Sequence, residues 1–511
     1  MFCTYNLSRN NFEGNLPPSI EQMKSLGWLD LSNNDFSGEV QISMFNDMTF
    51  LEFFLLGSNN FSGSIEEGLK NTSRLFLVAL DISNNMISGK IPSWIGSKKG
   101  LQYVQMSKNH FSGELPVEMC SLSQLIILDV SQNQLFGKVP SCFNSSSLVF
   151  MYMQRNYLSG PIPPVLLSSA SSLKILDLSC NHFSGHIPEW FENFTSLRVL
   201  LLKENELEGP IPQQLCQVEA ISIMDLSSNR LNGSIPSCFN NIMFGIIKGN
   251  QTTQTFNPPG VITFSSEDSD PDAGKEYCTP YTTSCPSTTI LILPVIQVEV
   301  DFTTKHRYEI YKGNVLNYMS GLDLSNNQLI GDIPQQIGDL VQIHALNFSN
   351  NKLVGNIPKA LSNLKQLESL DLSNNLLSGN IPPELATLDY LSIFNVSYNN
   401  LSGMIPTAPH FTYPPSSFYG NPKLCGSYIE HKCSSPVLPT DNQYEKLELE
   451  VDDGGFIDLE AFFWSFAASY IILLLGFVAV LCINPQWRQR WLYFIEDCYY
   501  LLLQAYIKCK N

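Results

Sequence analysis

Aliphatic residues recur along most of this chain in short alternating pairs, and each pair is followed by a polar turn that contains an asparagine. A glycine stands four residues after every one of these asparagines, and an aliphatic residue stands two further on. Proline follows that aliphatic residue in twelve of the fourteen copies, and Gln41 and Glu66 are the exceptions. The copies are 23 to 26 residues apart except for one interval of 98 residues; their asparagines are Asn10, Asn34, Asn59, Asn85, Asn109, Asn133, Asn156, Asn181, Asn205, Asn229, Asn327, Asn351, Asn375 and Asn399. A fixed period of this length predicts a solenoid of stacked coils.

Each position of the repeat has a physical role. Alternating leucines such as Leu176 and Leu178 predict a short strand with one buried face. Stacked coils place these strands about 4.8 Å apart in a parallel sheet. The asparagine amide can satisfy backbone groups left unpaired by the turn, and the glycine permits a backbone conformation that a Cβ would oppose. We expect the proline to end strand pairing, since it lacks an N–H. A helix or coiled coil would not tolerate glycine and proline in every repeat.

The copies that read L-D-L-S-x-N-x-x-S-G-x-I-P resemble the plant-specific class of extracellular leucine-rich repeats, and the remaining layout resembles the plant leucine-rich-repeat receptor-like proteins, which lack a kinase. This resemblance implies an α/β-type solenoid, a right-handed superhelix with a parallel concave sheet, followed by a single transmembrane helix. We expect ten copies in residues 1–242, an insertion at 243–312 and four copies in residues 313–409.

The insertion has no repeat motif, and it contains an acidic cluster and an apolar, strand-like run from Ile290 to Phe302. A structureless loop of this length inside a compact array is improbable unless it is functional. It resembles the island that interrupts the repeats of such receptors four copies from their end, a region that family uses for ligand or co-receptor contact. The resemblance makes Lys305, Tyr308 and Tyr311 candidate ligand contacts. Alternatively, Lys305 and Tyr311 only dock the island onto the next coil.

Ten of the thirteen cysteines precede the long apolar segment near the C-terminus. Residues 410–434 resemble the family's C-terminal cap, which implies a disulfide between Cys425 and Cys433. Cys278 and Cys285 form a candidate pair within the island. Two further candidate pairs share one register on adjacent coils, while Cys3 and Cys180 have no obvious partner; these pairs are Cys120 with Cys142 and Cys216 with Cys238. No C-x-x-C motif is present, so we favour disulfides over a metal site.

Ten N-x-S/T sequons favour a secreted, glycosylated ectodomain; they begin at Asn6, Asn60, Asn71, Asn144, Asn193, Asn232, Asn250, Asn347, Asn395 and Asn400. Asn347 and Asn395 occupy strand positions that we expect to face solvent on the concave side. A glycan there would obstruct a ligand that bridged this patch.

Residues 461–483 contain no charge and are long enough to cross a membrane as one helix. An acidic segment, 435–460, precedes them, and Arg488 and Arg490 follow them, so we expect extracellular repeats and a cytoplasmic tail at 484–511. Three small residues spaced four apart could pack against a second helix: Ala461, Ser465 and Ser469. Met1 falls within a repeat with no signal peptide before it, so we expect a truncated or mis-started reading frame, or a shortened family member.

The net charge of −18 makes nucleic acid an improbable partner, because phosphate binding needs a basic surface. No Walker, zinc-protease or kinase motif is present, so we expect no enzyme, no cofactor and no metal.

We expect a plasma-membrane receptor-like protein of immunity that binds an extracellular peptide or protein ligand and signals through an adaptor receptor-like kinase and a co-receptor kinase. Candidate ligand contacts are strand positions expected to face solvent: Gln105, Tyr152, Gln154, Arg198, Lys203 and Glu204. A developmental co-receptor without its own ligand, an inhibitor of secreted microbial wall-degrading enzymes and a non-functional truncated copy remain alternatives.

Overall fold

The computed structural model describes residues 3–433, except for 46, 66–76, 143–146, 164–171, 190–195, 246–260, 264–289, 293–297, 305–306, 410, 427–428 and 430–432. The chain divides into two units, Met1–Ser434 and Ser435–Asn511. The second unit, with the expected membrane span at 461–483 and its residues Ala461, Ser465 and Ser469, lies outside the described residues. Within the described residues, no helix has the length and apolar character needed to span a bilayer.

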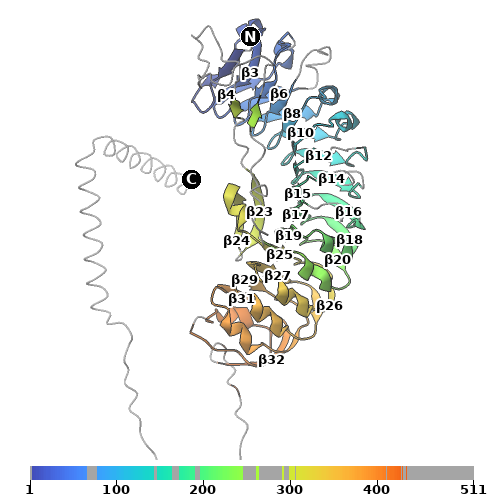
Figure 1. Ribbon diagram of the computed structural model, residues 1–511, viewed down its shortest axis with the longest axis vertical. Coiled ribbons are helices and arrows are strands. Elements are labelled where there is room, and N and C mark those ends of the chain that lie inside the picture. Colours follow the sequence, from blue (N-terminus) through green and yellow to red (C-terminus); the bar gives the residue numbers. More distant parts are fainter. Residues whose placement is uncertain are drawn as a thin grey trace, which may run out of the picture. The chain divides into compact units, whose positions relative to one another are not determined.

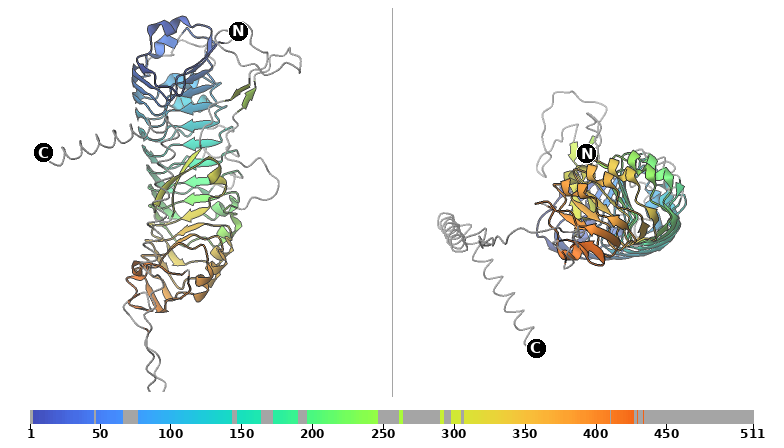
Figure 2. Two further views of the ribbon diagram at one scale, coloured as in Figure 1. Left: turned by 90° about the vertical axis from the view of Figure 1, so that its left-hand side faces the viewer. Right: turned by 90° about the horizontal axis from the view of Figure 1, so that it is seen from below.

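The alternating aliphatic residues form an inner parallel sheet with one strand per coil, and the strands stack like rungs along the first unit (Figure 2). Neighbouring strands pair in the same register, as where Leu176 lies opposite Leu200. The described part of this sheet has fourteen strands: β1 Cys3–Asn6, β3 Leu26–Asp30, β5 Phe53–Leu55, β7 Ala79–Asp81, β9 Tyr103–Gln105, β11 Ile127–Asp129, β13 Phe150–Tyr152, β15 Ile175–Asp177, β17 Val199–Leu201, β19 Ile223–Asp225, β25 Gly321–Asp323, β27 Ala345–Asn347, β29 Ser369–Asp371 and β31 Ile393–Asn395.

A second set of parallel strands follows the asparagine turn, which the sequence analysis did not anticipate. Residues between the asparagine and the proline are extended and pair with the corresponding strand of the next coil, two repeat positions out of step, as where Ser112 lies opposite Gln134. One sheet contains β2 Glu13–Gly14, β4 Asp35–Glu39, β6 Asn60–Ser64, β8 Met86–Lys90, β10 His110–Gly113, β12 Gln134–Gly137, β14 Tyr157–Gly160, β16 His182–His186, β18 Glu206–Pro210 and β20 Arg230–Asn232. After the interruption, β26 Ile330–Asp332 pairs with β28 Lys352–Val354, and β32 Asn400–Met404 lies between β30 Ser378–Asn380 and β33 Lys423–Cys425.

Short 3₁₀ helices complete the coils, and the described residues contain no α-helix, which corrects the α/β expectation to a β solenoid with 3₁₀ turns. Proline commonly occupies the N-cap, as Pro116 does for η4, because its fixed φ suits the entry to a helix. The described helices are η1 Pro18–Gln22, η2 Ile42–Phe45, η3 Ser93–Ser97, η4 Val117–Ser121, η6 Gln213–Gln217, η7 Ser237–Asn241, η8 Gly313–Asn317, η9 Gln335–Asp339, η10 Lys359–Asn363, η11 Pro383–Thr387 and η12 Pro415–Phe418.

The repeated asparagines form a continuous hydrogen-bonded ladder between coils. The Phe111 N–H donates to Asn133 Oδ1 at 2.9 Å, and Asn133 Nδ2 donates to the carbonyl oxygens of Met106, Val130 and Ser131 at 3.0, 3.1 and 3.0 Å. Two of these four groups belong to the preceding coil, so one side chain joins two coils. Buried backbone groups that would otherwise lack partners are thereby satisfied.

The ladder includes a fifteenth asparagine that the repeat motif did not reveal. Asn421 accepts the Leu401 N–H at 3.0 Å and donates to the Val396 and Phe418 carbonyls at 2.9 and 3.1 Å. The cap therefore continues the ladder by one irregular coil.

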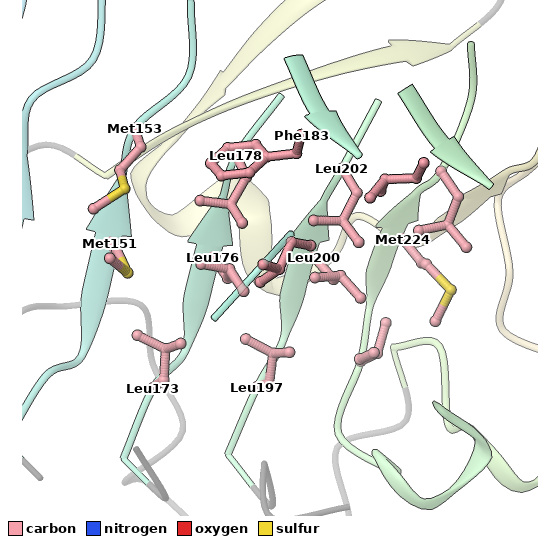
Figure 3. Packing of buried hydrophobic residues seen from close by; sticks show 14 of the residues in the cluster. Met151, Met153, Leu173, Leu176, Leu178, Phe183, Leu197, Leu200, Leu202 and Met224 are labelled. Atoms are coloured by element: carbon pink, nitrogen blue, oxygen red, sulfur yellow. The ribbon is translucent and has the colours of Figure 1, made fainter. Parts of the chain in front are cut away.

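The core lies between the inner and second strands and runs through the whole array. Figure 3 shows part of this core, in which leucines at equivalent positions, such as Leu173 and Leu197 or Leu178 and Leu202, form rows. These four side chains are fully buried. Because each coil contributes one layer, neighbouring coils bury one another's leucines.

Disulfides join Cys120 to Cys142 and Cys216 to Cys238, with Cα separations of 5.5 and 5.7 Å, and each links adjacent coils. A third joins Cys425 to Cys433 in the cap. Cys3 and Cys180 are free thiols. Cys278 and Cys285 lie outside the described residues.

Replacing one ladder asparagine tests this architecture. Asn133→Ala should lower the free energy of unfolding by about 2–4 kcal/mol, because it leaves a buried Phe111 N–H and three carbonyls short of a partner. The exposed neighbour gives a matched control, since Gln134→Ala should change stability by about 0.5 kcal/mol or less. Urea denaturation followed by circular dichroism measures both. Equal effects of the two substitutions would contradict the ladder.

Candidate recognition surface on the concave sheet

Residues in register with Trp28 of β3, which are the first residues of the following inner strands, form an apolar row on the open face of the sheet. From Trp28 in β3 to Ile223 in β19 this row is continuous and buried, and it forms a cluster separate from the main core. Beyond the interruption the row is smaller, with Gly321 and Ala345 at the equivalent positions. The open face thus changes character where the repeats resume.

The last residues of alternate inner strands form a second row, in which carboxylates predominate. Asp177 is representative: its Oδ1 accepts the Ser179 N–H at 3.0 Å and the Ser179 hydroxyl at 2.6 Å. Burial nevertheless raises the pKa of Asp177, and likewise that of Asp81, to about 6. The carboxylate row comprises Asp30, Asp81, Asp129, Asp177, Asp225, Asp323 and Asp371.

The interruption brings two of these carboxylates together. Neutral residues separate most members of the row, but β19 pairs directly with β25, so Asp225 and Asp323 lie opposite each other on neighbouring strands. Burial, and then the charge of Asp225, raise the pKa of Asp323 to about 7. Asn347 Nδ2 donates to Asp323 Oδ2 at 3.0 Å, and this hydrogen bond offsets part of the rise in the pKa of Asp323.

A hairpin from the end of the insertion lies across the open face (Figure 1). Strands β23 (Glu299–Thr304) and β24 (Arg307–Lys312) pair antiparallel, and we call this hairpin the strap. Val298, Val300 and Phe302 pack into the apolar row. The Phe302 ring occupies the space that a Cβ on Gly321 would need, which accounts for the glycine at that position.

Two basic residues of the sheet hold Asp301 of the strap. Arg155 Nη2 lies 3.2 Å from Asp301 Oδ2, while Lys203 Nζ lies 3.8 Å from Asp301 Oδ1 and donates to the Asp301 carbonyl at 3.3 Å. Lys203 Nζ also lies 3.5 Å from Asp225 Oδ2. Burial alone would lower the pKa of Lys203, but the carboxylates of Asp225 and Asp301 outweigh it and raise that pKa, so Lys203 stays charged. A further contact joins Arg198 Nη1 to Asn317 Oδ1 at 3.2 Å.

The structure corrects the exposure expected for three candidate contacts. Tyr152, Arg198 and Lys203 are only 8, 6 and 3% exposed. Arg198 and Lys203 contact residues about a hundred positions further along the chain, which a repeat period cannot reveal.

The remaining candidates differ in accessibility. Gln105 and Gln154 are half-buried and Glu204 is exposed. Tyr311 is half-buried against the apolar row and shares a 2.5 Å hydrogen bond with Thr304. The backbone of Tyr308 pairs with Thr303, and Lys305 lies outside the described residues.

Buried polar atoms without a hydrogen-bond partner also occur on this face. Within the described part of the chain, these include the Tyr152 hydroxyl and Gln154 Oε1. A buried polar atom without a hydrogen bond lowers the stability of the fold. A ligand that offered a polar group to these atoms would remove that cost, as expected at a binding surface.

The sequon asparagines fall into three groups. Asn6, Asn60, Asn232 and Asn400 are exposed. Asn347 and Asn395 are half-buried on the inner sheet and donate to Asp323 and Asp371, so they do not simply face solvent as expected. Those outside the described residues are Asn71, Asn144, Asn193 and Asn250.

Comparison with family models identifies leucine-rich repeats. One Leucine rich repeat model matches residues 171–231, and a second matches 76–97, 319–340, 342–364 and 366–388.

Curated relatives are plant receptor-like proteins. Receptor-like protein 13 of Arabidopsis thaliana is 50% identical over 202 residues, which cover 39% of this chain and 18% of that protein. Cuscuta receptor 1 of Solanum lycopersicum is 57% identical over 224 residues, which cover 42% of this chain and 19% of that protein. The matched part of the chain thus spans about a fifth of the length of these relatives.

Solved structures agree on the fold. The Arabidopsis receptor kinase HAESA, in complex with the peptide hormone IDA and the co-receptor SERK1, superposes with a TM-score of 0.59 at 26% identity, over 84% of this chain and 62% of HAESA. The plant peptide hormone receptor RGFR1 in complex with RGF2 has a TM-score of 0.58 at 23% identity, over 82% and 62% of the two chains.

The carboxylate row predicts a pH dependence of stability. The raised pKa of Asp81 means that the folded chain takes up this proton before the unfolded chain does as the pH falls. The free energy of unfolding should therefore be lowest near pH 8, increase as the pH falls through about 6 and level off near about 4.

Asp81→Asn should be more stable than the unsubstituted chain by about 2–3 kcal/mol at pH 8 and equally stable near pH 4, because the amide carries no charge. Asp35→Asn at an exposed site is the control and should shift neither value. Urea denaturation at the two pH values measures the difference. A stabilisation independent of pH would show that the buried charge is not its cause.

Proposed function

Because the repeats of this chain are leucine-rich repeats of plant receptor-like proteins, we propose that it is a cell-surface receptor for an extracellular peptide or protein ligand. The observation that carries this proposal is the concave sheet, where an apolar row, buried basic side chains and a hairpin from the insertion meet. A concave, mostly apolar surface with a few placed polar groups is typical of a binding site.

The solved complex of HAESA supports a peptide ligand and a co-receptor as partners, since HAESA was crystallised with a peptide hormone and with SERK1. We extend both classes of partner to this chain. The ligand would meet the exposed Glu204 and the half-buried Gln105 at the margin of the strap. We further propose a role in immunity, with a developmental co-receptor that has no ligand of its own as the alternative.

We further propose that residues 461–483 span the plasma membrane, with the repeats outside and residues 484–511 inside. We propose that the signal passes through associated kinases, as the resemblance to plant receptor-like proteins implies. An adaptor kinase would pack its own membrane helix against Ala461, Ser465 and Ser469, because small residues allow close helix approach.

Helix packing can be tested by co-purification of kinases with the full chain from plant membranes. Replacing Ala461, Ser465 and Ser469 by leucine should reduce capture of the adaptor kinase at least fivefold, because larger side chains separate the helices. Ala467→Leu lies on the opposite side of the same helix and should leave capture unchanged. Unchanged capture with the triple variant would reject this contact.

Ligand binding can be tested by capturing extracellular peptides and proteins on the full chain. Glu204→Arg should weaken capture at least tenfold, because it reverses an exposed charge at the margin of the concave surface. Glu118→Arg, on η4, is the matched control and should bind normally. Equal binding by both variants would place recognition elsewhere.

A further inference from the structure

The strap is held in the concave groove as a bound peptide would be. Val300 and Phe302 enter the apolar row, and Asp301 between them meets Arg155 and Lys203. Apolar, acidic and apolar residues therefore occupy the groove in succession in an extended conformation. This segment is an internal ligand of the sheet.

The groove favours an acidic segment because two basic groups, Arg155 and Lys203, meet the carboxylate of Asp301. The carboxylate row lies beside these basic groups, and the buried Lys203 also contacts Asp225 of that row. Arg155 is half-exposed and reaches the strap from the side. A carboxylate that entered between Arg155 and Lys203 would replace the negative charge of Asp301. A neutral group would leave the buried positive charge of Lys203 with one carboxylate fewer beside it.

We propose that the ligand of the concave groove is an extended acidic peptide with an apolar–Asp/Glu–apolar sequence, which displaces strand β23 and takes the place of Asp301 between Arg155 and Lys203. This inference rests on the proposed receptor function and adds its ligand class and its regulation. The strap then acts as an intramolecular competitor that keeps the groove covered until a better-fitting peptide arrives.

Displacement is physically reasonable because the strap is a small element. The described part of the hairpin has only two strands, and an isolated two-stranded hairpin is marginal in water. Its stability therefore depends on docking, through Val298, Val300, Phe302 and the contacts of Asp301. Opposing this, the covalent connection gives the strap a high effective concentration, on the order of millimolar for flexible linkers.

The outer surface of the strap is suited to temporary exposure. Ile310 in β24 is 54% exposed, and Val315 and Tyr318 just after it are 51 and 74% exposed. A peptide could instead add to the free edge of β24 without moving β23, and this alternative is one outcome of the test.

The test uses the full chain and a synthetic peptide with the sequence of residues 298–304, labelled for fluorescence anisotropy. Asp301→Asn removes the charge that holds the strap on the sheet. Arg155→Gln removes one of the two basic groups that contact this carboxylate, and we expect this variant to fold because Arg155 is half-exposed. Glu309→Gln, exposed on β24, is the matched control. Hydrogen exchange of β15, β17 and β19 verifies that the repeats stay folded in every variant.

We expect Asp301→Asn to accelerate amide exchange in β23 and β24 about tenfold and to bind the peptide at least tenfold more tightly than the unsubstituted chain, since one charge-assisted hydrogen bond changes an equilibrium by about that factor. A peptide with Asp301→Asn should bind at least tenfold more weakly than the acidic one. Adding Arg155→Gln should also weaken binding, while Glu309→Gln should change nothing.

The proposal is overturned if Asp301→Asn leaves strap exchange unchanged, if the acidic and amide peptides bind equally, or if the bound peptide leaves β23 as protected as before. The assay uses no kinase and no membrane partner. Its failure would therefore leave kinase capture intact, and a failure of kinase capture would leave this result intact.

Discussion

The side-chain amide of the repeated asparagine is the interaction on which the structure depends. It joins each coil to the preceding one, because the asparagine lies in register with buried N–H and carbonyl groups of both coils. The ladder continues across the insertion: the Leu231 N–H donates to Asn327 Oδ1, and Asn327 Nδ2 donates to the Leu226 carbonyl, both at 3.0 Å. The two ends of the insertion are thereby brought to adjacent coils, and the strap can return to the concave face.

This arrangement has an electrostatic cost that the strap partly offsets. Stacking β25 on β19 places Asp323 beside Asp225, two buried carboxylates that repel each other. Lys203 approaches Asp225 from the neighbouring strand and Asp301 from the strap. The same buried lysine therefore stabilises the joint between the two repeat blocks and holds the hairpin that covers it, which links the architecture to the proposed recognition surface.

Much of the fold could be predicted from the sequence because every coil has the same residue types at the same positions of its inner strand and turn. The spacing of Asn133 and its equivalents, and of the glycine four residues later, predicts the inner strand and the turn directly. The second sheet was missed, since residues such as Ser112 and Gly113 are extended only through pairing with neighbouring coils and carry no strand signal of their own. Asn421 was missed because its coil is two residues shorter than the period.

The recognition surface was harder to predict than the fold. Arg198 comes directly before β17 and Lys203 follows it, both next to the leucines of the repeat, yet their partners, Asn317 and Asp301, lie about a hundred residues away along the chain. Only the three-dimensional return of these partners buries them. Glu204 lies in the turn after β17, where its φ is +52°, and its side chain is exposed.

The most direct test of this account is an experimental density map of the full chain at side-chain resolution. The account predicts that β19 lies next to β25 in one continuous sheet, with the Asp301 carboxylate between Arg155 and Lys203 above it. A map in which the two repeat blocks are separated, or in which β23 lies outside the concave groove, would contradict it.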